Sequence, residues 1–78
     1  MGSQSDVRVA DAVLAMQAAL AAAPTALARL TLLKRACARL DATIALHEEA
    51  NLPAAMRIRR LYGDMLRVEE QKAGEAAA

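Results

Sequence analysis

Cys37 and His47 are the single cysteine and the single histidine of the chain, and these residue types most often serve as nucleophile and general base. The predicted helix that carries both places them about 15 Å apart along its axis. A catalytic pair has to lie within hydrogen-bond distance, so we expect no nucleophile–base pair within this helix. One His and one Cys also fall short of the three or four ligands of a zinc site. We therefore interpret Cys37 as a buried apolar thiol.

The rest of the sequence offers no other catalytic motif. It contains only 3 Gly, none of them in a Gly-rich phosphate-binding loop, and it shows no paired carboxylates at a spacing typical of acid–base catalysis. A helical bundle of this size has no interior room for the cavity of about 300 Å³ that a drug-sized ligand fills. We therefore expect no enzyme, no cofactor, no metal and no small-molecule substrate.

Arginines are the residues that could recognise nucleic acid. The five candidates are Arg35, Arg39, Arg57, Arg60 and Arg67. The last three share one face of a predicted helix, where guanidinium groups could contact phosphates. No aromatic side chain accompanies them for base stacking, and the net charge of the whole chain is only +1. A solvated Arg face that pairs with nearby acids is the preferred interpretation, and a nucleic-acid-associated regulator is the alternative.

The size of the chain limits how it can be stabilised. A domain of 78 residues buries a small share of its surface, and one Cys excludes an internal disulfide. Oligomerisation, a partner or well-formed helices must supply the remaining stability. No segment reaches the roughly 20 apolar residues of a membrane span, and Gln17 interrupts the most apolar run. We expect no membrane association and a cytoplasmic location.

Apolar residues recur three and four positions apart, which predicts three amphipathic helices and no strands. The predicted helices cover about 6–22, 26–50 and 53–72 and form one domain over 6–72. Pro24 and the segment 51–53 break the pattern, and Thr25 is suited to cap the second helix. We expect residues 1–5 to be disordered or a cloning remnant and residues 73–78 to be a frayed tail.

Each predicted helix has one apolar seam. In the first helix the seam is Val9, Val13, Met16, Leu20 and Ala23, and in the second it is Leu30, Leu33, Cys37, Leu40, Ile44 and His47. In the third it is Ala54, Ile58, Leu61, Met65 and Val68, widened by Tyr62 and Leu66. We expect Tyr62 to lie at the margin of the core with its hydroxyl in water.

The short connections require neighbouring helices to run antiparallel. The simplest fold is an all-α, up-down-up three-helix bundle. A helical hairpin that self-associates into a larger antiparallel bundle is an alternative. A third version keeps the second and third helices as the hairpin and docks the first helix on a partner.

Some apolar residues lie outside the seams and are candidates for binding protein. Leu32 and Leu46 share a second stripe on the middle helix, opposite its seam. Ala15 and Ala19 belong to a face of the first helix that is poor in charge, so we expect this helix to be covered on more than one side. Met56 faces away from the third seam.

These surplus apolar surfaces predict a protein-interaction module. It would be an adaptor or a chaperone-like subunit that works as a homo-oligomer, in the manner of a coiled coil, or with another helical protein. A designed bundle without a biological role is a further alternative.

Overall fold

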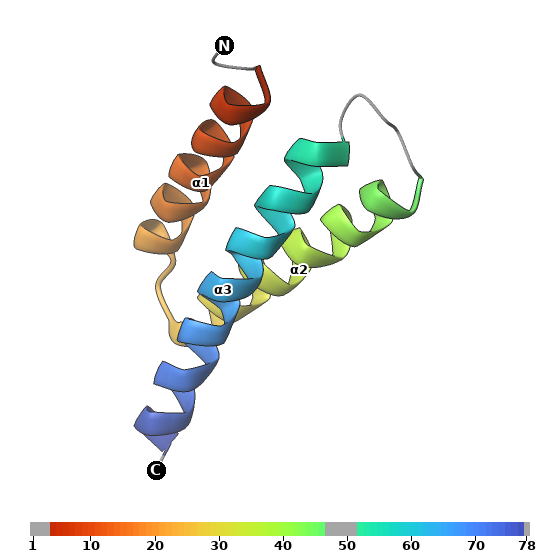
Figure 1. Ribbon diagram of the computed structural model, residues 1–78. Coiled ribbons are helices and arrows are strands. Elements are labelled where there is room, and N and C mark those ends of the chain that lie inside the picture. Colours follow the sequence, from red (N-terminus) through yellow and green to blue (C-terminus); the bar gives the residue numbers. More distant parts are fainter. Residues whose placement is uncertain (1–3, 47–51, 78) are drawn as a thin grey trace.

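The structure is a computed structural model that describes residues 4–46 and 52–77, and within these ranges the chain is all-α. Helix α1 covers Gln4–Ala22, α2 covers Ala26–Ala45 and α3 covers Leu52–Ala77. Figure 1 shows α1 and α3 side by side and running in the same direction, while α2 runs the opposite way and crosses α3 at an angle. The prediction of an all-α, up-down-up bundle of three helices is confirmed.

The turn between α1 and α2 follows the predicted capping pattern. The Ala23 N–H donates to the carbonyl of Leu20 at 3.2 Å, which closes the last turn of α1. Thr25 has an extended backbone, with φ −138° and ψ 162°, and its Oγ1 accepts the N–H of Ala28 at 3.0 Å. This bond satisfies one of the free N–H groups at the start of α2, so α2 begins directly after Thr25.

Three helix ends differ from the sequence prediction. Helix α1 begins at Gln4, so Gln4 and Ser5, which were expected to be disordered or a cloning remnant, are helical. Helix α2 ends at Ala45, with Leu46 as its C-cap, and not at residue 50. Residues 47–51, which include His47, lie outside the described residues. Helix α3 continues to Ala77, so the segment from 73 expected as a frayed tail is helical. Its alanines and Glu75 favour the helix enough to offset the unfavourable Gly74.

Helix α3 is central to the packing. It contacts both α1 and α2, whereas α1 and α2 make few contacts with each other. The core lies where Leu33 and Cys37 of α2 meet Tyr62 of α3. Residues from all three helices surround this cluster: Ala12, Val13, Met16, Leu20, Ala36, Leu40, Ile58, Met65 and Leu66. The seams predicted for α1 and α2 are therefore the faces that pack.

The seam predicted for α3 is partly wrong. Leu61 and Val68, expected in the core, are 38% and 49% exposed, whereas Ala55 and Tyr62 are buried. Helix α3 has a neighbour on each of two sides, so its buried face is broader than one seam. That face keeps Ala54, Ile58 and Met65 of the predicted seam and extends to Tyr62 and Leu66, which were expected to widen it, and to Ala55.

The position of Tyr62 also corrects the sequence prediction. Its side chain is only 8% exposed, and its hydroxyl donates to the carbonyl of Ala12 on α1 at 2.8 Å, so the hydroxyl does not lie in bulk water. Burial of the ring raises the pKa of this phenol, and Cys37 raises it further. The only aromatic residue of the chain thus joins α3 to α1.

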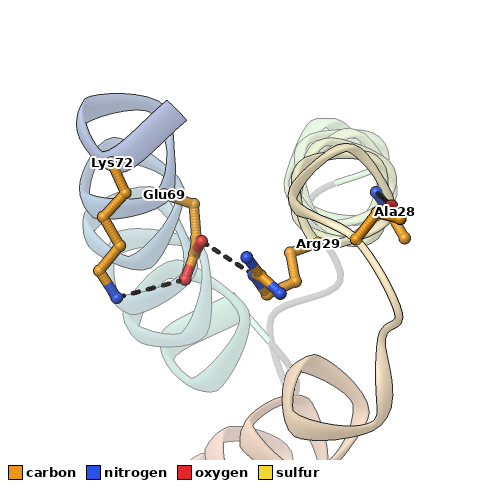
Figure 2. Close-up of polar contacts among 5 residues, drawn as sticks. Ala28, Arg29, Glu69 and Lys72 are labelled. Atoms are coloured by element: carbon orange, nitrogen blue, oxygen red, sulfur yellow. Dashed lines mark hydrogen bonds and ion pairs between the residues drawn. The ribbon is translucent and has the colours of Figure 1, made fainter. Parts of the chain in front are cut away.

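Ion pairs connect the helices at the edge of the core. Arg29 of α2 contacts Glu69 of α3 at 3.1 Å, and Lys72 approaches the other oxygen of the same carboxylate at 3.8 Å (Figure 2). Arg59 of α3 binds Asp41 of α2 at 2.8 Å. The exposed Arg59–Asp41 pair contributes at most about 1 kcal/mol, whereas the Arg29–Glu69 pair is partly buried, with the Glu69 side chain only 12% exposed.

Candidate protein-interaction surfaces

The second stripe predicted on α2 is open to solvent. Leu46 is 71% exposed and Leu32 is 37% exposed. They belong to a row spaced four and three residues apart, which we call the α2 stripe: Ala28, Leu32, Arg35, Arg39, Ala42 and Leu46. Because Leu33 and Cys37 face the core, this row faces away from α3. Neither Arg35 nor Arg39 forms an ion pair with another described residue, so the stripe is both apolar and basic.

Helix α1 has its own open row, which sequence reasoning missed. Val7 is 58% exposed and Leu14 is 63% exposed. With Asp11, Ala18 and Ala21, all exposed, they form a row on the side opposite the seam of α1, which we call the α1 stripe. The spacing of four and three residues was present in the sequence, but the many alanines of the adjacent face obscured it.

The alanines chosen from the sequence lie beside this row. Ala15 is exposed, whereas Ala19 is half-buried. We expected α1 to be covered on more than one side, and that expectation is wrong for this chain alone. Only α3 packs extensively against α1, so the rest of its surface stays open.

Other apolar side chains are exposed on the remaining faces. Met56 of α3 is 54% exposed and faces outward as expected, and Leu27 in the first turn of α2 is 73% exposed. Within residues 6–46 and 52–75, the large apolar side chains that are exposed number eight: Val7, Leu14, Leu27, Leu32, Leu46, Met56, Leu61 and Val68. In the same ranges, Leu33 is the only large side chain that is fully buried.

The five candidate arginines are all exposed but do not form one surface. Arg35 and Arg39 face away from α3, whereas Arg57, Arg60 and Arg67 lie on the side of α3 that faces away from α2. The two groups therefore lie on opposite sides of the α2–α3 pair. Arg57 is also engaged, because it contacts Asp6 of α1 at 2.6 Å. This partner comes from another helix and is not one of the neighbouring acids that the sequence suggested.

A shallow hollow of about 360 Å³ lies on the outer side of α3. Its lining consists of Arg57, Arg60, Leu61 and Asp64, all from the same helix. The hollow is open to solvent and carries both signs of charge, so it has neither the enclosure nor the convergent polar groups of a substrate pocket.

The buried thiol lacks the features of a nucleophile. Burial raises the pKa of Cys37, although Arg59 partly opposes the shift, so the thiol is protonated at neutral pH. Within the described ranges, no three His, Cys, Asp or Glu side chains come together as metal ligands. His47 is outside those ranges, so its predicted place at the end of the α2 seam stays a prediction.

The comparisons with known proteins identify no relative. No family model matches the chain, and no curated protein or solved structure is significantly similar to it. Among the described residues, no helix is long and apolar enough to span a bilayer. Because no similar protein suggests a function, the proposal below is based on the exposed stripes of α1 and α2.

Proposed function

We propose that this chain is a small helical interaction module, an adaptor or chaperone-like subunit that works as an oligomer or within a complex. The observation that carries the proposal is the imbalance, within residues 6–46 and 52–75, between eight exposed large apolar side chains and a single fully buried one. Clustered exposed apolar residues with polar neighbours are typical of protein-binding surfaces. The α2 stripe is the docking surface in this proposal.

The pattern of the α2 stripe suits a helical partner. Residues spaced four and three apart form a straight row along a helix, and a second helix can pack its own side chains between them. Ala28 and Ala42 allow close approach, while Leu32 and Leu46 supply apolar area. Covering two leucines that are now partly in water would favour association by roughly 2–4 kcal/mol.

The test replaces both leucines of the α2 stripe by glutamate. Leu32→Glu combined with Leu46→Glu places two charges where a partner helix would lie, so we expect association to be lost while the helices remain. Solution mass from light scattering reports association, and circular dichroism reports helical content. A mass that rises above the 8.3 kDa monomer with concentration in the wild type, and stays at 8.3 kDa in the helical variant, supports the proposal.

Leu27→Glu is the matched control. Leu27 is on the same helix and is 73% exposed, but it lies outside the α2 stripe, so its replacement should change neither mass nor helicity. If the double variant loses its helical content while Leu27→Glu keeps it, the two leucines belong to the core. That result would refute the proposed surface.

A further inference from the structure

The molecule exposes more surface than a compact monomer of its mass. Its accessible surface is 5536 Å², and its Cα radius of gyration is 13.6 Å, with extents of 44 × 24 × 16 Å. The scaling law for compact monomers gives about 4,600 Å² for 8.3 kDa, so the chain exposes roughly 900 Å² more. A standard interface takes about 800 Å² from each partner. The surplus thus matches one subunit's share of an interface.

The two open stripes have complementary charge. The α2 stripe carries Arg35 and Arg39 between its leucines, and the α1 stripe carries Asp11 between Val7 and Leu14. Asp6, the other acid of α1, contacts Arg57 within the same chain, whereas Asp11 forms no ion pair with another described residue. The acid available on α1 therefore complements the basic centre of the α2 stripe.

The same charges oppose pairing of the α2 stripe with its own copy. An antiparallel pair of α2 stripes that matched Leu32 with Leu46 would set Arg39 against Arg39. Like charges placed opposite each other across an interface disfavour that pairing strongly. The better occupant of the α2 stripe is an apolar helix that carries an acid near its middle, and α1 has this character.

We propose that a second copy of this chain is the occupant, with the α1 stripe of one copy packed antiparallel on the α2 stripe of the other. This inference rests on the proposed function, because it names the partner of the same surface. The spacing of both rows aligns Asp11 with Arg35, Leu14 with Leu32, and Ala18 with Ala28. At these three positions charge meets charge, large meets large and small meets small, while Val7 lies opposite Arg39 and Leu46 extends beyond the end of the α1 stripe.

Two-fold symmetry forms this contact twice. Each subunit offers its α1 stripe to its partner's α2 stripe and receives the reverse, so the assembly closes as a dimer. The two contacts together use the α1 stripe and the α2 stripe of each subunit, which agrees with the surplus of roughly 900 Å² in accessible surface.

Charge reversal tests the alignment. Asp11→Arg sets an arginine against Arg35, and Arg35→Asp sets an aspartate against Asp11, so each variant alone should weaken self-association by about tenfold or more. An equimolar mixture of the two variants recreates one wild-type contact and one reversed contact. The mixture should therefore return to the wild-type mass by light scattering at equal total concentration.

The control is Arg67→Asp, which makes the same change of charge on α3 outside both stripes. It should leave the dissociation constant of the wild type unchanged. Both stripe positions are exposed, and circular dichroism checks that each variant keeps its helices. If one reversed variant fails to fold, the other still tests the contact against the control.

Three results would overturn the inference. A wild-type chain that stays at 8.3 kDa up to millimolar concentration excludes a second copy as the occupant. A mass unchanged by Asp11→Arg, or a mixture that fails to recover the wild-type mass, excludes the α1 stripe. When the wild type associates but either charge-reversal result fails, the effect of the two glutamates on α2 judges the proposed function separately.

Discussion

At the scale of single residues, Tyr62 of α3 contacts both of the other helices. It is the only aromatic side chain of the sequence, it packs against Leu33 and Cys37, and its hydroxyl reaches the backbone of α1. From the sequence we expected the ring at the margin of the core and the hydroxyl in water. In the structure the ring is buried because α1 and α2 pack on α3 from two sides. The apolar pattern of one helix does not predict this arrangement.

Tyr62→Phe should lower the free energy of unfolding by about 1 kcal/mol, because it removes the hydrogen bond to Ala12 and keeps the ring. Urea unfolding measured by circular dichroism checks this value. The comparison variant is Met56→Ala on the open face of α3, which should change the stability by less than about 0.5 kcal/mol. Equal stabilities for Tyr62→Phe and the wild type would show that this bond does not hold α1 in place.

Cys37 should make the fold sensitive to alkaline pH. Burial raises the pKa of its thiol in the folded state, so the fold favours the protonated form. The resulting stabilisation is complete below the unfolded-state pKa of about 8.5 and is lost as the pH rises through the higher folded-state pKa. Urea unfolding at several pH values from 7.5 upward should show the decline. Cys37→Ala should decline less, and an identical decline would contradict the assignment.

At the scale of elements, the sequence predicted the seams of α1 and α2 because each packs mainly against one neighbour, α3. A helix with a single neighbour buries a single row of side chains. Apolar residues that recur three and four positions apart identify such a row. Helix α3 has two neighbours, so Leu61 and Val68 were assigned to the core wrongly. The predicted N-cap at Thr25 is confirmed, since capping depends on residues close in sequence.

Replacing the glycines of α3 by alanine should change the stability of the fold. A Cβ at Gly74 meets nothing within 4 Å, so Gly74→Ala should stabilise the last turns by up to about 1 kcal/mol through helix propensity alone. Gly63→Ala should give less, because its Cβ would lie 2.9 Å from the Arg59 guanidinium, which would have to shift beside Asp41. Urea unfolding ranks the two variants. A greater gain at position 63 would contradict this account of the Arg59 contact.

At the scale of the whole molecule, the candidate surfaces could be predicted only in part. Leu32, Leu46 and Met56 lie outside the predicted seams and are exposed, while Val7 and Leu14 were missed beside a face rich in alanine. The division of the five arginines between two sides depends on how α2 packs on α3. The sequence of either helix alone does not contain that information.

We propose that association covers the apolar stripes that an isolated chain leaves exposed. This proposal is tested most directly by the solution mass of the wild type and of the variant with Leu32→Glu and Leu46→Glu, measured by light scattering over a range of concentrations. We predict a wild-type mass that rises above 8.3 kDa and a variant that stays at 8.3 kDa with unchanged helical content. Equal masses for the two chains at every concentration, or a variant that unfolds, would contradict the account.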